Sequence, residues 1–264
     1  MAERSMRQQK FLDDCRKDKI RVNFFRITIV VLLVILWEAA TWNGMIDSFI
    51  YSSPSRIVKC FVDMFKDGNI IRHILVTLFE TGVSFTLVNG VGILVAVILW
   101  CKLSVAKITE PYLVVLNSLP KSALAPLLIV WLGNSMKTII VAAISVAVFG
   151  TIISIYTGFM GVDAEKIKLI YTLKGNKRDV LMKVVIPSTL PLIISTMKVN
   201  IGLSLVGVII GEFLAANEGL GYLIIYGTQV FKLDMVMMSI IVLCIISGLL
   251  YKLISIFEKK CEKY

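Results

Sequence analysis

Long apolar runs separated by short charged segments make up most of the chain. Two of these runs, 81–101 and 138–162, contain no charged residue. An α-helix needs about 20 mostly apolar residues to cross a hydrocarbon core roughly 30 Å thick, and both runs reach that length. They are therefore predicted to be transmembrane helices.

Four further runs are apolar over a similar length, although charged residues interrupt most of them. They span about 26–46, 108–132, 189–212 and 235–251. Barrel strands would alternate in polarity over segments of about 10 residues, so these continuous runs exclude a barrel. The first run lacks the small-residue cleavage pattern of a signal peptide and is expected to be retained. The pattern thus predicts an all-α integral membrane protein built as a six-transmembrane-helix bundle.

The charge distribution along the chain predicts how this bundle is oriented. Only 17% of the residues are charged, against roughly 25% in an average soluble domain. About twenty Lys and Arg lie in 1–26, 101–110, 161–183 and the tail from residue 252, against about six in the alternate loops. Because cytoplasmic loops carry the excess of positive charge, both termini are expected to be cytoplasmic.

This topology also divides the chain and explains its basic character. Residues 1–25 and 259–264 are predicted to be cytoplasmic tails of a transmembrane domain at 26–258, placed in the cell (cytoplasmic or inner) membrane. The net charge of +10 lies mostly where topology and anionic lipid headgroups would put it. A nucleic-acid partner is therefore not expected.

No motif for catalysis, metal binding or nucleotide binding is found. The five cysteines are scattered without metal or redox spacing, and His73 has no catalytic partner in the pattern. Neither "KGNKRD" nor "GNSMKT" has the spacing of a Walker A sequence. We therefore expect no enzyme activity, no metal site and no cofactor in this chain.

Small residues recur at four-residue intervals in three of the predicted spans. They are Gly82, Thr86 and Gly90 in one, Gly150, Ser154 and Gly158 in another, and Gly207 and Gly211 in a third. Such stripes let helix backbones approach closely in a membrane. We expect them to pack helices of one chain against each other.

One charged segment interrupts the apolar second half, with the sequence "YTLKGNKRDVLMKVVIPSTLP" at 171–191. Asp163 is a suitable N-cap for a short helix that reaches about Lys174, and Gly175 suits the left-handed residue that ends it. Asn176 can cap a second helix, with Asp179 in the position of a capping box. The segment is thus predicted to form a helix, a sharp bend and a second helix.

The second helix of this segment is predicted to be amphipathic and to end at Pro187. Its apolar face would pack on the cytosolic ends of the membrane helices, and the tip from Leu173 to Arg178 would project into the cytosol. A basic loop that only fixes topology is the alternative interpretation. Such a loop, however, would not need caps, a bend glycine and a proline.

The charged segment and three further stretches resemble a known family. These stretches are "LNSLPKSALAPLLIVWLG" (116–133), "VVIPSTLP" (184–191) and "GEFLAANEGLGYLI" (211–224), and "SSPSR" precedes the second span. Together they resemble integral membrane permease subunits of type I ABC importers, in particular the nitrate, sulfonate and taurine branch. The similarity runs from about residue 52 to 258, with its core at about 70–258, and 163–187 corresponds to the "EAA" loop.

The loop departs from the family pattern at two places. The acidic-Ala-Ala element is missing, because its positions hold Lys168, Leu169 and Ile170. Counting back from Pro187, the family's glycine falls on Lys174, and Gly175 follows it. These differences affect the contacts expected of the loop.

The resemblance implies how the protein works and with what. It implies that the loop couples this chain to two cytoplasmic ABC ATPase subunits, which bind ATP and Mg and hydrolyse the ATP. The residues that carry this role by resemblance are Leu173, Lys174, Gly175, Asn176, Arg178, Asp179 and Pro187. The resemblance also implies an extracytoplasmic substrate-binding protein and a second permease copy. A homodimer is expected, and a heterodimer with a related permease stays open.

Polar residues at membrane depth are costly and are therefore candidates for the translocation pathway. They are Asn117, Lys121, Lys198, Asn200 and Glu212. Lys121 lies between two prolines in a span whose backbone is interrupted. For the "EGLG" at 218–221 a gate, a contact with the binding protein and a plain loop stay open. Glu38 and Glu80 are expected at solvated outer helix ends.

The substrate is predicted only as a small solute. An anion such as a sulfonate or nitrate, or a vitamin precursor, is the expectation that the resemblance gives. A secondary transporter driven by an ion gradient stays open as an alternative, although no repeat between the halves supports it. A membrane assembly subunit without a transport pathway is the other alternative.

Overall fold

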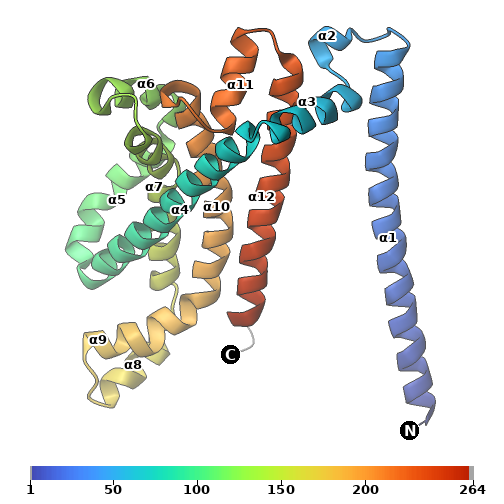
Figure 1. The fold of residues 1–264 in the computed structure, drawn as a ribbon. Coiled ribbons are helices and arrows are strands. Elements are labelled where there is room, and N and C mark those ends of the chain that lie inside the picture. The colour runs from blue at the N-terminus through green and yellow to red at the C-terminus, as the bar shows by residue number, and fades with distance from the viewer. Residues whose placement is uncertain (1, 262–264) are drawn as a thin grey trace.

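The computed structural model describes residues 2–261, and within this range all regular secondary structure is helical (Figure 1). The helices are α1 (Ala2–Trp42), α2 (Ser48–Tyr51), α3 (Pro54–Lys66), α4 (Asn69–Cys101), α5 (Leu103–Ser118), α6 (Lys121–Leu132), α7 (Met136–Met160), α8 (Ala164–Thr172), α9 (Lys177–Val180), α10 (Ile186–Ala215), α11 (Leu220–Gln229) and α12 (Leu233–Cys261). A π-helical turn at Leu181–Val185 joins α9 to α10. The predicted all-α class is confirmed.

Five of the six predicted spans are continuous helices. They are α1, α4, α7, α12 and the helix that runs through α9 and α10 from Lys177 to Ala215. The sixth, predicted at 108–132, is instead two helices, α5 and α6, bent by 95°. The bend follows from Pro120, because a proline disfavours helical backbone at the residue before it, and Leu119 is extended with ψ 139°.

The ends of the bundle differ in what they carry (Figure 1). The α8–α9 hairpin, the start of α1 and the end of α12 lie at one end, and α2, α6 and α11 lie at the other. The end with the α8–α9 hairpin is the hairpin end, and the end with α11 is the α11 end. The cytoplasmic location of the hairpin end remains a prediction from the charge distribution.

Close backbone packing around α7 forms the centre of the bundle. A Cβ on Gly207 or Gly211 of α10 would lie 2.6 Å from the Cα of Ala143 or 2.9 Å from that of Ile139, both on α7. A Cβ on Gly92 of α4 would likewise lie 2.5 Å from Cγ2 of Thr151, which is also on α7. These contacts confirm the packing role predicted for Gly207 and Gly211.

The small-residue stripe of α4 does not pack inside the chain. A Cβ on Gly82 or Gly90 would meet no atom within 4 Å, and both residues are exposed. The prediction that this stripe joins helices of one chain is therefore wrong. The opposite face of α4, which carries Gly92, is the one that contacts α7.

Helix α1 stands apart from the other spans and meets them through α3 (Figure 1). The carboxylate of Glu38 accepts hydrogen bonds from the backbone N of Ser55 (3.0 Å) and from its Oγ (2.8 Å). This places a negative charge at the first turn of α3, where the helix dipole favours it. Glu38 is half-buried in this contact.

A second polar contact ties α3 to the start of α12. Asp234 Oδ2 pairs with Arg56 Nη2 at 2.9 Å, and Asp234 Oδ1 accepts a hydrogen bond from Ser52 Oγ at 2.7 Å. The "SSPSR" stretch therefore joins α1, α3 and α12 at the α11 end.

Replacing Gly207 by Ala is expected to lower the stability of the bundle by about 1–3 kcal/mol, because the added methyl group overpacks the α7–α10 contact. Thermal unfolding in mild detergent measures the change. Gly202→Ala is the matched control, since it lies on the same helix and its Cβ would meet no atom within 4 Å. Equal midpoints for the two variants would contradict the close-packing interpretation.

Candidate functional site

Both short helices of the hairpin at 163–187, α8 and α9, begin with the N-caps that the sequence predicts. Asp163 Oδ1 accepts a hydrogen bond from the backbone N of Glu165 at the start of α8 (2.9 Å). At the start of α9, Asn176 Oδ1 accepts from the backbone N of Asp179, and Asp179 Oδ2 accepts from the backbone N of Asn176, each at 3.0 Å. The capping box is therefore confirmed.

The bend between the two helices differs from the prediction by one residue. Lys174 has the left-handed backbone, with φ +60°, and Gly175 does not. The backbone N of Gly175 donates to Ile170 O and that of Lys174 to Tyr171 O, each at 2.9 Å, which is the Schellman pattern. Lys174 is also the position on which the family's glycine falls.

Gly175 is nonetheless required, for a different reason. A Cβ there would lie 2.5 Å from Ile170 Cγ2 and 2.9 Å from Ile170 O. The chain thus needs a residue without a side chain at 175, so that the bend can fold back on α8.

Pro187 does not end the second helix, so that part of the prediction is wrong. The backbone N of Ile186 donates to Leu181 O, five residues back, and the helix then continues as α10. A proline lacks an N–H and clashes with the carbonyl four residues before it in a regular helix. The wider π-helical turn directly before Pro187 lets the helix pass through the proline.

The apolar face of the hairpin packs on the ends of α4 and α7. Val180 and Val185 are fully buried there, in a cluster that includes Trp100 of α4 and Phe159 of α7. Lys177 Nζ donates to the backbone O of Cys101 (2.5 Å) at the end of α4. The tip faces outward, with Leu173, Lys174, Asn176 and Arg178 exposed and Gly175 half-buried. Of the two further hairpin residues predicted to couple to the ATPase, Asp179 is half-buried and Pro187 is exposed.

A cavity of about 310 Å³ lies between α5, α7 and α10, and it is called the polar cavity here because half of its lining residues have polar side chains. Its polar lining residues are Asn117, Thr151, Ser154, Ser195, Thr196 and Asn200, and none of its lining residues is charged. Asn200 Oδ1 accepts from Thr151 Oγ1 (3.0 Å), and Asn200 Nδ2 donates to Asn89 Oδ1 (2.8 Å). A chain of hydrogen bonds from α7 through α10 to α4 therefore holds one wall of the cavity.

The two lysines among the pathway candidates lie in different places. Lys121, at the start of α6, donates from Nζ to the backbone O of Asn117, which lines the cavity. Lys198 of α10 instead pairs with Glu258 of α12 and lies 6.0 Å from the ring centre of Tyr251. The residues that line the cavity do not include Lys198.

Glu212 is buried at the α11 end, with 1% of its surface exposed, and its carboxylate holds the turn that leads into α11. Its Oε1 accepts from Thr77 Oγ1 of α4, and its Oε2 accepts from the backbone N of Gly221, each at 2.6 Å. The backbone N of Leu220 donates to Thr77 Oγ1 (2.9 Å). The side chain thus connects α10, α4 and α11.

This carboxylate explains the glycines of the "EGLG" stretch. Gly219 has φ +113°, and a Cβ there would lie 2.3 Å from Glu212 Oε1. A Cβ on Gly221 would lie 2.8 Å from Glu212 Oε2. The backbone of the turn therefore wraps the carboxylate so closely that only glycine fits at both positions.

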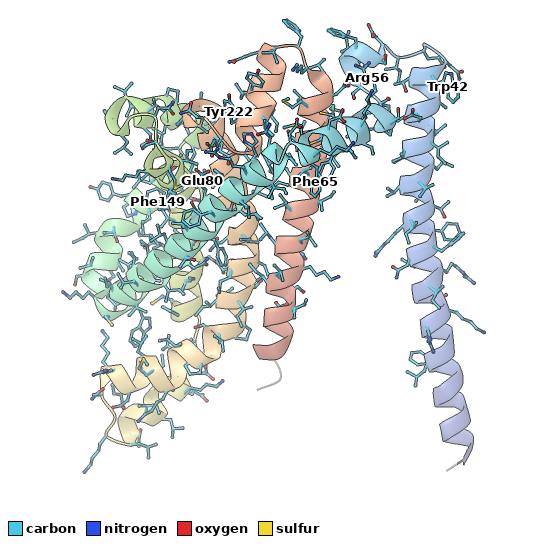
Figure 2. All side chains as sticks on the ribbon, in the orientation of Figure 1. Trp42, Arg56, Phe65, Glu80, Phe149 and Tyr222 are labelled. Carbon is cyan, nitrogen blue, oxygen red and sulfur yellow. The ribbon has the colours of Figure 1, made fainter. Side chains whose placement is uncertain are left out.

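Glu80 is a residue whose place was predicted wrongly. It was expected at a solvated helix end, but it lies part-way along α4 (Figure 2) and is only 1% exposed. Glu212 of α10 is its charged neighbour there. The reason is that α4 begins at Asn69, a full three turns before Glu80. The sequence held a signal for this start, because Gly68 precedes Asn69 and takes the N-cap with φ +72°.

With this geometry in place, comparison with known proteins identifies the family. The model of the binding-protein-dependent transport system inner membrane component matches residues 89–261. The chain belongs to this family. It is the membrane permease subunit of an ABC importer, a multi-pass transport subunit of the inner membrane rather than an enzyme.

Individual relatives and a solved structure agree with this assignment. A putative aliphatic sulfonates transport permease protein of Bacillus subtilis is 23% identical, over 90% of this chain and 86% of the relative. The formylaminopyrimidine transport permease protein of Halalkalibacterium halodurans is 28% identical, over 73% and 76%. The fold is similar to a chain of the inward-facing MetNI methionine ABC transporter, with TM-score 0.64, 16% identity and coverage of 74% and 97%.

Replacing Gly219 by Ala is expected to destabilise the permease and loosen the turn before α11. The added Cβ would displace the Glu212 carboxylate, in addition to the strain of about 1–3 kcal/mol from an unsuitable backbone. Thermal unfolding and limited proteolysis at the turn measure both effects. Gly133→Ala is the control, because Gly133 also has positive φ (+75°) but open space around it. A loss of stability in Gly219→Ala no larger than that in Gly133→Ala would contradict the role of the carboxylate.

Proposed function

We propose that the hairpin at 163–187 docks into a cytoplasmic ABC ATPase subunit and couples ATP hydrolysis to movement of this permease. The observation that carries this proposal is the combination of a fixed base and an open tip. The base is buried against Trp100 and Phe159, whereas Leu173 at the tip is 70% exposed. An exposed leucine on a rigid, capped bend suits insertion into a groove of a partner.

The ATPase subunits would supply the nucleotide-binding site for this importer. In this proposal ATP and Mg bind to two ATPase subunits, and no cofactor binds to the permease itself. The continuous helix from Lys177 to Ala215 carries the hairpin at one end and the cavity residues Thr196 and Asn200 further along. A displacement of the hairpin would therefore move the cavity wall directly.

The polar cavity is proposed as one half of the translocation pathway. Its walls offer hydroxyl and amide groups, and two of its apolar lining residues, Val199 and Leu203, are 60% and 37% exposed. A second permease copy facing this side would cover these residues and close the pathway. A homodimer supplies such a copy, and the extracytoplasmic binding protein would deliver substrate at the α11 end.

The substrate is proposed to be a small organic solute with several hydrogen-bonding groups. The absence of charged residues from the cavity lining supports recognition by hydrogen bonds, and Lys121 at the cavity edge is compatible with an anionic group. Sulfonates and formylaminopyrimidine, which the names of two relatives mention, both fit this class.

Replacing residues 173–178 by a Gly/Ser linker is expected to abolish association with the ATPase, because the capped bend is lost. The tagged chain is purified from its native host in mild detergent, and mass spectrometry measures the ATPase that accompanies it. The control is the same linker at residues 43–46, in the turn before α2 at the opposite end. Undiminished ATPase in the 173–178 variant would contradict the docking role.

Filling the cavity by Ser195→Leu is expected to reduce transport about tenfold or more, because the leucine would occupy space that the solute needs. A loss of about 1.4 kcal/mol in binding free energy already corresponds to a factor of ten. Uptake is measured in proteoliposomes with the purified importer. ATPase association should be unchanged, which separates this result from failure of the hairpin. Ser195→Ala adds no bulk and removes only one of the polar groups of the lining, so it should lose much less transport than Ser195→Leu. Full transport by Ser195→Leu would remove the cavity from the pathway.

A further inference from the structure

Two carboxyl groups meet inside the bundle, away from the polar cavity. Glu80 of α4 and Glu212 of α10 are each only 1% exposed, and their side chains are neighbours in the interior of the bundle. Thr77, three residues before Glu80 and so on the same helical face, donates to Glu212 at 2.6 Å. The contact therefore follows from the packing of α4 against α10.

The two carboxyl groups have different surroundings. Glu212 accepts a hydrogen bond at each oxygen, from Thr77 Oγ1 and from the backbone N of Gly221. Donors of this kind stabilise an ionised carboxylate. Glu80 has no such donor among the described residues, and its Oε2 is buried without a hydrogen-bond partner.

No positive charge in the described part of the bundle balances a second negative charge here. Of the titratable groups nearby, Arg72 pairs with Glu218, and His73 Nδ1 accepts from the backbone N of Gly219 (2.9 Å). The charge that acts on Glu80 is that of Glu212. On the other packed elements, Lys198 of α10 pairs with Glu258, Tyr222 of α11 stacks on His73, and Lys137 of α7 is exposed at its helix start.

Two adjacent carboxyl groups can form a hydrogen bond only if one of them is protonated. We propose that Glu80 and Glu212 form a proton-binding site, in which Glu80 carries the proton and donates it to the Glu212 carboxylate. The bound proton then fastens α4 to the turn between α10 and α11. The permease would hold this proton in the described arrangement of the bundle, independently of the cargo in the cavity.

The proton would also bias the conformation of the permease. If α4 separated from the α10–α11 turn, both carboxyl groups would meet water and each would ionise independently. A ligand favours the state to which it binds more tightly. The proton therefore favours the arrangement in which α11 is held against α4.

Infrared spectroscopy of the intact chain in lipid nanodiscs at neutral pH tests the proposal, because it detects the C=O stretch of a protonated carboxyl group. The wild-type chain should show this band in the presence of sodium. The band should disappear in Glu80→Gln, whose amide can still donate to Glu212, and persist in the matched control Glu38→Gln. In Glu212→Gln the band should remain but shift, since its hydrogen-bond acceptor changes.

Several results would overturn the proposal. A band that persists in Glu80→Gln would assign the proton to another residue. A band that appears only after sodium is removed would make the ligand a metal cation instead of a proton. An unshifted band in Glu212→Gln would show that Glu80 does not donate to Glu212, and this arm stays informative even if Glu80→Gln fails to fold.

Discussion

The close approach of α7 and α10 is the contact on which the rest of the bundle depends. Lipid tails are as apolar as leucine, so helices in a membrane associate by close packing and by hydrogen bonds rather than by escape from water. At Gly207 and Gly211 the backbones meet without intervening side chains, beside Ala143 and Ile139. Because the helices lie this close, short polar side chains such as Asn200 and Thr151 can bond across them.

The long helix that runs through α9 and α10 connects features at both ends of the molecule. From Lys177 to Ala215 the backbone is helical without a gap, and it carries the hairpin base, the Asn200 wall of the cavity and Glu212. A rigid element of this kind is a physical route by which two distant sites can influence each other. In this arrangement, whatever moves the hairpin also acts on the cavity wall and on the turn that Glu212 holds.

The sequence predicted features that depend on neighbouring residues and missed those that depend on distant ones. Five spans and the Asn176 capping box follow from local patterns, and both are confirmed. The pairing of Lys198 with Glu258, 60 residues away, and the contact of Glu80 with Glu212 depend on which helix faces lie together. Periodicity alone does not determine those faces, because the spans are apolar on nearly every side.

The departures of the hairpin from its family pattern have a physical explanation in the backbone. Lys174 takes the left-handed position without glycine, while the Schellman hydrogen bonds and the contact of Gly175 with Ile170 hold the bend. The π-helical turn before Pro187 sets the direction in which the hairpin leaves α10. Since backbone geometry fixes the hairpin, the missing acidic-Ala-Ala element changes the exposed surface of the hairpin but leaves the shape of the bend intact.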